Sequence, residues 1–212
     1  MNTDDRLAAV IAAVMKDDHV HARWLNTFSF LEYIGFRKIV KSQRAEVLNR
    51  SLLMHALEEG RHALLLKKLA VKLGGHEFDF YRAETMFCPA AARTYFQELD
   101  HQCDAKFAHL GDLERSTLVY LYVTWLIERR ALDVYGCYNN MLGDSDLAPK
   151  LNALLAEEVG HLRAVESGIA AKDPEHAKRS AQFEALEFAL YKDFVGVMAR
   201  ELAAHRAEAP PA

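Results

Sequence analysis

Two stretches decide the fold: HALEEGRHALLLKKLA at residues 55–70 and LLAEEVGHLRAV at residues 154–165. In both, apolar residues recur every three or four positions, which is the spacing of a helix face that packs in a bundle. Each stretch carries the motif Glu-Glu-x-x-His, at 58–62 and at 157–161. The second glutamate and the histidine of each motif lie on one helix face. The sequence therefore predicts two helices that each present a carboxylate and an imidazole within a core-facing stripe.

Each motif is preceded by a single glutamate on another predicted helix. Glu32 precedes Glu59 by 27 residues, and Glu128 precedes Glu158 by 30 residues. Both single glutamates lie in apolar stripes that should also face the core. The chain is thus interpreted as two helix pairs related by an approximate repeat. The segment between them, residues 74–111, would supply the long crossover that such a bundle needs.

The rest of the chain is also helical in pattern, with glycine and proline at intervals that suit helix ends. We expect an all-α protein forming a single domain over residues 1–212, with a four-helix bundle at its core over residues 20–171. Residues 76–88 are the least regular segment, and no segment is expected to be a β-strand. The expected helices, including additional N-terminal, crossover and C-terminal ones, cover residues 4–15, 20–42, 45–73, 89–110, 113–142, 147–171 and 174–206.

The composition is that of a globular protein, with 51% hydrophobic residues and a formal net charge of −4. This balance gives no general attraction to nucleic acid or to an anionic membrane, although local basic patches are compatible with it. No apolar run reaches the ~18 residues of a membrane span, and the N-terminal segment lacks the basic cluster of a signal peptide. The three cysteines form no C-x-x-C pair, which argues against a disulfide framework or a zinc ribbon. We therefore expect a cytoplasmic protein without nucleic-acid or membrane partners.

The buried glutamates point to bound cations. An ionised carboxylate in an apolar core is costly unless it is paired or bound to a cation, and four such cases on four helices need a shared explanation. A pair of divalent cations supplies one, and four carboxylates with two imidazoles suit two iron ions, with manganese as an alternative. The predicted metal ligands are Glu32, Glu59, His62, Glu128, Glu158 and His161.

The bare Glu-x-x-His motif is weak, because a third copy occurs at Glu98 and His101. That pair lies off the apolar stripe of its helix, so we expect it to face solvent and not to bind metal. The first glutamates of the two doublets, Glu58 and Glu157, are alternative ligands if the helix phase differs by one residue.

At this point the sequence resembles the ferritin-like di-iron carboxylate superfamily. The matching residues are Glu32 in FLEYIG, Glu59 and His62 in EEGRH, Glu128 in WLIERR, and Glu158 and His161 in EEVGH, over residues 20–171. The resemblance implies a ferritin-like four-helix bundle that holds two irons. Members of that superfamily store iron, reduce peroxide, hydroxylate substrates, oxygenate amines or deformylate aldehydes, and the branch is not indicated. The cysteine-ligated iron module of rubrerythrin-like proteins is absent.

Several residues near the predicted site have two interpretations. His55 lies one turn before Glu59, and a similar triplet supplies an extra histidine ligand in arylamine N-oxygenase-like enzymes, although there in the second helix pair. Here it is either an extra ligand or a hydrogen-bonded histidine behind the ligands. Gly35, one turn after Glu32, would leave space for O2 or substrate, or allow a close helix contact. Four tyrosines would either pack in the core or hydrogen-bond to ligands: Tyr33, Tyr120, Tyr122 and Tyr135.

The leading functional hypothesis is an oxidoreductase that uses O2 or peroxide to oxidise a small organic substrate. No flavin or NAD motif is visible, so an electron-donor protein is implied. The first alternative is a ferroxidase, iron-storage or peroxide-scavenging protein without an organic substrate. The second is a non-catalytic helical bundle with a degenerate site. The oligomeric state is left open, with a homodimer as one alternative.

Overall fold

The computed structural model describes residues 3–42, 45, 48–143 and 145–208. Over these ranges it contains α-helices and one short 3-10 helix but no strand, so the all-α prediction is confirmed. None of the described helices combines the length and the apolarity needed to cross a membrane. The helices are α1 (Thr3–Val14), α2 (Asp18–Ser42), α3 (Arg50–Gly74), α4 (Pro89–Lys106), α5 (Asp112–Leu142), α6 (Ala148–Lys172) and α7 (His176–Glu208), with the 3-10 helix η1 at His76–Asp79.

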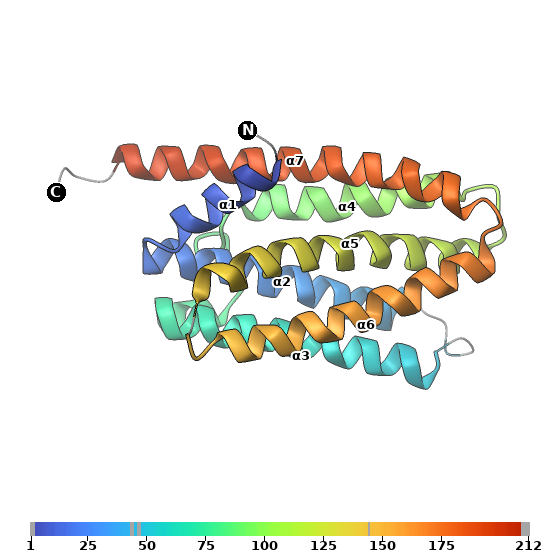
Figure 1. Cartoon of the computed structure of the whole chain (residues 1–212), viewed down its shortest axis with the longest axis horizontal. Helices are drawn as coiled ribbons and strands as arrows, with labels where there is room; N and C mark the ends of the chain where they lie inside the picture. Colours follow the sequence, from blue (N-terminus) through green and yellow to red (C-terminus); the bar gives the residue numbers. More distant parts are fainter. Residues whose placement is uncertain (1–2, 43–44, 46–47, 144, 209–212) are drawn as a thin grey trace.

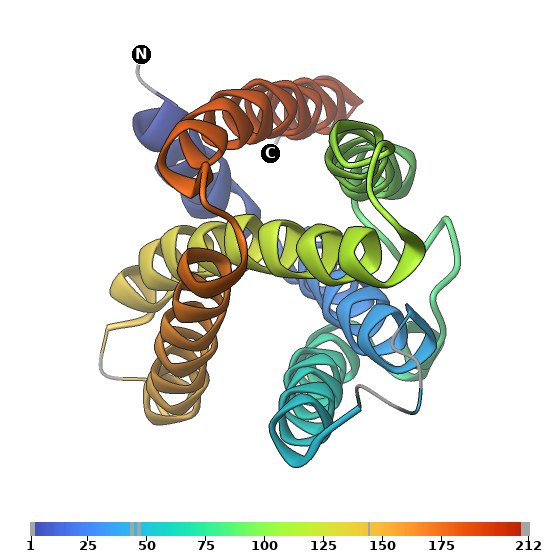
Figure 2. The same cartoon turned by 90° about the vertical axis from the view of Figure 1, so that its right-hand side faces the viewer.

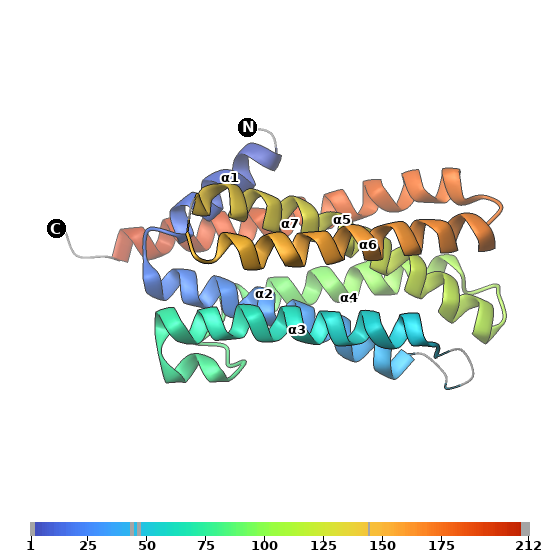
Figure 3. The same cartoon turned by 60° about the horizontal axis from the view of Figure 1, so that its bottom comes forward.

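The helices are arranged around a central pair, α2 and α5 (Figures 1 and 2). α2 packs along α3, and α5 packs along α6, so each predicted helix pair is formed by consecutive helices. α3 and α6 lie on one side of the central pair, while α1, α4 and α7 lie on the other. The segment between α3 and α5 carries α4 along the length of the bundle, as Figure 3 also shows. The four helices that carry the predicted ligands therefore surround one interior.

Most predicted helix boundaries lie within a few residues of the observed ones, and the differences have local causes. The helix predicted from residue 45 begins at Arg50, because the Asn49 side chain accepts a hydrogen bond from Leu52 N–H and caps it; residues 46–47 lie outside the described part of the chain. The helix predicted to begin with Pro174 begins instead at His176. Asp173 accepts a hydrogen bond from Glu175 N–H there, and residues 174–175 form a turn.

The apolar core consists of two clusters, one toward each end of the bundle. The larger cluster includes Trp24 on α2 and Tyr138 on α5. The other includes Phe107, Tyr122 and Phe183. The predicted ligands lie along their helices between the residues that contribute to the first cluster and those that contribute to the second. Packed side chains on both sides therefore hold the middle of each helix in place.

Candidate metal centre

The six predicted ligands and His55 are all buried in the middle of the bundle. Each retains at most 8% of its exposed surface. Glu32 comes from α2 and Glu128 from α5, whereas α3 contributes His55, Glu59 and His62, and α6 contributes Glu158 and His161. Buried carboxylates at this density are stable only if protons or cations neutralise them.

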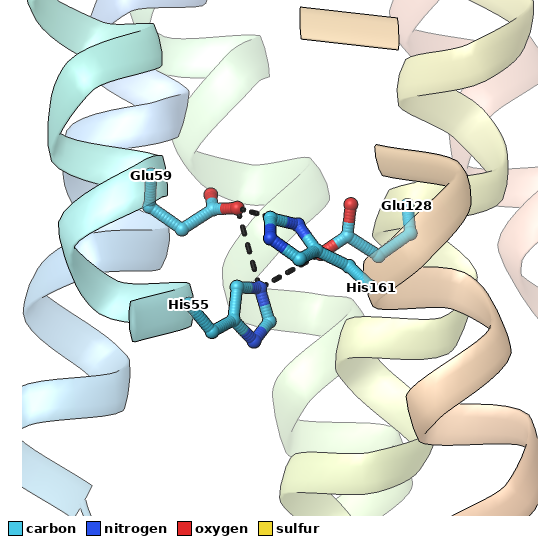
Figure 4. A group of neighbouring side chains, drawn as sticks. All are labelled: His55, Glu59, Glu128 and His161. Atoms are coloured by element: carbon cyan, nitrogen blue, oxygen red, sulfur yellow. Dashed lines mark hydrogen bonds and ion pairs between the residues drawn. The ribbon is translucent and has the colours of Figure 1, made fainter. Parts of the chain in front are cut away.

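The seven side chains form two groups that share Glu59. One group consists of His55, Glu59, Glu128 and His161, and its donor atoms lie within 4.8 Å of one another. Figure 4 shows these four side chains converging from α3, α5 and α6. The other group consists of Glu32, Glu59, His62 and Glu158, within the same limit. Each group offers carboxylate oxygens and imidazole nitrogens, which suit iron, manganese or zinc.

Two carboxylates lie between the groups, because Glu59 belongs to both and Glu158 contacts a histidine of each. Glu59 Oε1 lies 3.3 Å from His55 Nε2 and 3.6 Å from His161 Nδ1. Glu158 places Oε1 3.0 Å from His62 Nδ1 and Oε2 3.1 Å from His161 Nδ1. Glu59 and Glu158 are therefore positioned to contact cations in both groups, whereas Glu32 and Glu128 each belong to one.

Two buried donor atoms in the centre make no directed hydrogen bond to any described residue: Glu59 Oε1 and His62 Nδ1. A buried polar atom without a hydrogen bond costs free energy of about 1–3 kcal/mol. Both atoms face the interior of the centre, where a bound cation would satisfy them. The residues present therefore fit the divalent cations that their chemistry implies.

The outward nitrogens of two histidines are held by the other helix pair. His62 on α3 donates from Nε2 to Glu157 Oε2 on α6, at 2.8 Å. His161 on α6 donates from Nε2 to Glu58 Oε2 on α3, also at 2.8 Å. In both rings Nδ1 is thereby left to face the centre, and a carboxylate on the second nitrogen is the usual arrangement for a metal-bound histidine.

Glu58 and Glu157 thus lie behind the histidines, and the structure favours Glu59 and Glu158 as the glutamates that face the centre. Arg61 lies beside both outer glutamates, with Nη2 3.0 Å from Glu157 Oε1 and 3.5 Å from Glu58 Oε1. Sequence reasoning missed this crossed arrangement. The repeated Glu-Glu doublet is the only hint of this arrangement in the sequence. A pattern along one helix does not show which other helix its side chains contact.

Two tyrosines contact the candidate ligands. The Tyr135 hydroxyl donates a hydrogen bond to Glu32 Oε1, and the Tyr120 hydroxyl is 2.9 Å from His55 Nδ1. This contact leaves His55 Nε2 facing Glu128 Oε1, at 3.0 Å, so the geometry favours the extra-ligand interpretation of His55. The other two tyrosines lie elsewhere: Tyr122 donates to Asp173, and Tyr33 stacks on Tyr81.

Without bound metal, two carboxyl groups and two histidines of the centre bind protons more tightly than usual. Burial and the neighbouring carboxylates raise the pKa of Glu32 and of Glu128 well above the usual value. Burial disfavours the charge on His62, but the adjacent Glu158 carboxylate, 3.0 Å away, outweighs it and raises the His62 pKa to about 9. Burial likewise opposes the charge on His161, but its hydrogen bonds to Glu128 and Glu158 raise the pKa to about 11. Binding of cations would displace these protons.

The absence of a side chain at Gly35 leaves room for the Glu59 carboxylate. A methyl group on Gly35 would lie 2.9 Å from Glu59 Oε2, which is closer than a carbon and an oxygen pack in proteins. Gly35 also lines two small cavities beside the centre. The glycine therefore leaves room for a ligand side chain as well as for open space next to it.

Those two cavities lie on the side of the centre where the carboxylates face. One, of about 50 Å³, is bordered by Glu32 and Glu59 and has largely apolar walls that include Phe28 and Phe194. The other, of about 30 Å³, is bordered by Glu59 and Glu128. An open groove of about 810 Å³ between α3 and α6 reaches His55, His161 and the two outer glutamates.

The third Glu-x-x-His pair faces solvent, as the sequence predicts. Glu98 and His101 on α4 are both exposed, and neither belongs to a group of potential ligands among the described residues. Burial separates this pair from the two that converge in the core, whereas the motif alone does not.

Comparison of the chain with protein-family models, with curated proteins and with solved structures gives no match. The assignment of the centre therefore rests on its own residues and their geometry.

Proposed function

We propose that this protein is a di-iron oxidoreductase with a ferritin-like bundle, which uses O2 or peroxide to oxidise a small organic molecule. The observation that supports the proposal best is the pair of four-donor groups that share Glu59. In this proposal Glu32, His62 and Glu158 hold one cation, and His55, Glu128 and His161 hold the other. Glu59 would contact both.

The charge of the centre is consistent with this proposal. Four carboxylates with neutral histidines carry a charge that two divalent cations would balance. Iron bound by such oxygen and nitrogen donors supplies the redox chemistry for reaction with O2 or peroxide, and manganese accepts the same donors. The chain's own contribution is to hold the metal ligands in place, through the hydrogen bonds that Glu58 and Glu157 accept from His161 and His62, and to exclude water with apolar cavity walls.

A protein that handles iron or peroxide without an organic substrate is the second candidate. The observation in its favour is the size of the cavities beside the carboxylates, about 50 and 30 Å³. A cavity of about 10–15 Å³ on this measure holds one water molecule, so these cavities accommodate O2 or peroxide. A larger substrate requires a route from the surface.

Metal analysis of the purified protein tests the centre. We expect two ions per chain, one for each group, measured by elemental analysis after loading with Fe(II) or Mn(II) without oxygen. Glu59→Gln keeps the shape of the side chain but removes a charge that faces both groups, so it should weaken binding of both ions. Glu98→Gln on the exposed third motif is the matched control and should bind as the unmodified protein does. Loss of metal in both variants, or in neither, would contradict the assignment.

Oxygen uptake by the reduced, iron-loaded protein distinguishes the two functions. Repeated turnover that depends on an added organic compound and an electron donor supports the oxidoreductase. A single round of uptake that yields only ferric iron, whichever compound is added, supports iron handling.

A further inference from the structure

A groove between α2 and α4 is lined by several positively charged side chains. α2 and α4 run side by side and pack loosely (Figures 2 and 3), and the groove between them encloses about 380 Å³. We name it the α2–α4 groove. Its rim carries four cationic side chains: Arg37, Lys38 and Lys41 on α2, and Arg93 on α4.

These cations outnumber the acids that face them. Asp100 is the single acidic residue that lines the groove among the described residues, and it forms an ion pair with Lys38. Arg37, Lys41 and Arg93 are exposed and make no ion pair with a described carboxylate. The whole chain has a net charge of −4, so this rim is a local reversal of sign. A rim of this kind attracts anions.

The floor of the α2–α4 groove is apolar. Phe30 and Ile34 on α2 and Phe96 on α4 form it. The Arg93 guanidinium lies over the Phe30 ring, 5.8 Å from its centroid, which keeps the charge at the edge of the apolar surface. A ligand that fits both features carries an anionic group and an apolar body.

The inner wall of the α2–α4 groove borders the candidate metal centre. Phe96 lines the groove and also both small cavities beside Glu59. Lys38 lines the groove and the cavity bordered by Glu59 and Glu128. Phe96 and Lys38 therefore lie at the boundary between the α2–α4 groove and the cavities beside Glu59. The groove between α3 and α6 reaches the centre from behind the histidines instead.

We propose that the α2–α4 groove binds a small amphipathic anion, a molecule with a carboxylate or phosphate at one end and an apolar body. The anionic group lies between Arg37 and Arg93, and the apolar body lies along Phe30, Ile34 and Phe96 with its end toward the centre. That this molecule is the one oxidised rests on the proposed function. Binding in the groove does not.

Calorimetry with decanoate as the probe tests the binding, on the full chain without metal. Decanoate should bind, decylammonium should not, and butyrate, which lacks the apolar body, should bind far more weakly. Added salt should weaken decanoate binding, because the rim is exposed. Equal binding of decanoate and decylammonium would overturn the proposal. So would binding of an acidic peptide, poly-glutamate, in place of decanoate, since the rim would then be a protein docking surface.

Substitutions locate the site. Arg37→Gln combined with Arg93→Gln should weaken decanoate binding about tenfold, since each exposed charge pair contributes modestly. The matched control, Arg163→Gln with Arg206→Gln, removes two exposed charges from α6 and α7 and should leave binding unchanged. Ile34→Ala should weaken decanoate binding but not the residual binding of butyrate. Equal loss in the two double variants would show a general charge effect and overturn the proposal.

Proton relaxation of bound decanoate in the Mn(II)-loaded protein reports its orientation. The terminal methyl should relax faster than the methylene next to the carboxylate, because the apolar end points toward the metal. The reverse order would overturn the placement. Metal analysis and calorimetry test the two proposals separately. Binding of two ions without binding of decanoate would support the proposed function and overturn the proposed binding site in the α2–α4 groove. Binding of decanoate without binding of metal would support the binding site and overturn the proposed function.

Discussion

Replacing Gly35 by alanine separates the requirements of the fold from those of the centre. Gly35 lies within α2, where alanine is favoured over glycine by about 0.5–1 kcal/mol. The new methyl would lie 2.9 Å from Glu59 Oε2 and 3.8 Å from Glu59 Cδ. Carbon atoms pack at about 3.5–4.0 Å, so the carboxylate oxygen has to move by about 0.5 Å.

That displacement is small for a side chain and large for a metal ligand. Bonds to a metal are set to within about 0.2 Å, and Glu59 belongs to both groups. We therefore expect the affinity for Mn(II) to fall about 10–100-fold, the range seen when support behind a metal ligand is lost. The free energy of unfolding of the metal-free protein should change by less than about 1 kcal/mol, because the gain in helix propensity offsets the cost of moving Glu59.

Two measurements on each variant decide the outcome. Free Mn(II) is followed by electron paramagnetic resonance during titration, and unfolding of the metal-free protein is followed in urea. Gly136→Ala on α5 is the matched control, since its methyl would meet nothing within 4 Å. It should stabilise the fold slightly and bind Mn(II) normally. Normal Mn(II) binding by Gly35→Ala would refute the position assigned to Glu59, and a loss of several kcal/mol of stability would show that Gly35 serves packing.

Three further predictions concern pH, the outer glutamates and the core. Raising the pH from 7 to 9 should destabilise the metal-free protein, by about 2 kcal/mol through His62, whose pKa is raised to about 9, and should strengthen Mn(II) binding, as urea unfolding and titrations at each pH would show. The sign follows because the native state binds these protons more tightly than the unfolded chain does, and stability unaffected by pH would contradict it. The groups with raised pKa values are Glu32, Glu128, His62 and His161. Glu157→Gln should weaken Mn(II) binding about tenfold, because His62 loses the carboxylate that holds it. Glu98→Gln should leave Mn(II) binding unchanged. Equal Mn(II) affinities of the two variants would contradict the role of Glu157 in holding His62. Leu66→Ala, at a fully buried position, should cost about 2–5 kcal/mol in urea unfolding without changing the number of ions bound; a smaller cost would mean that the core collapses around the gap.

The sequence predicts which of these side chains are buried, because helix periodicity determines which positions face inward. Glu59 and Glu158 lie on apolar stripes, and the structure buries both. Glu98 lies off its stripe, and the structure exposes it. One period of 3.6 residues is enough to separate these cases. The same reasoning indicates four helices, since each carries its glutamate at mid-length.

Helix periodicity does not predict which side chains of two different helices contact each other. The hydrogen bond that His62 donates to Glu157 joins α3 to α6, and the one that Tyr135 donates to Glu32 joins α5 to α2. Each depends on the angle and height at which two helices pack, which side chains throughout the interface decide together. The predicted start of α7 at Pro174 is wrong for a local reason. Asp173 forms a turn that places Pro174 before the helix rather than in it.

The crossed pairing of Glu58 and Glu157 gives the doublets a physical explanation. A ligand histidine needs a partner on its outer nitrogen, and a partner on the same helix would have to lie on the same face as the ligands. A glutamate one residue before the ligand glutamate is rotated by about 100° around the helix, toward the neighbouring helix. The second glutamate of each doublet therefore faces the centre, and the first accepts a hydrogen bond from the histidine on the other helix, α6 or α3. Because this exchange runs in both directions, α3 and α6, which have few other contacts, are joined through the two histidines. A change in the spacing of these two helices would move His62 and His161 together, so the geometry of the centre and the packing of the two helix pairs are coupled.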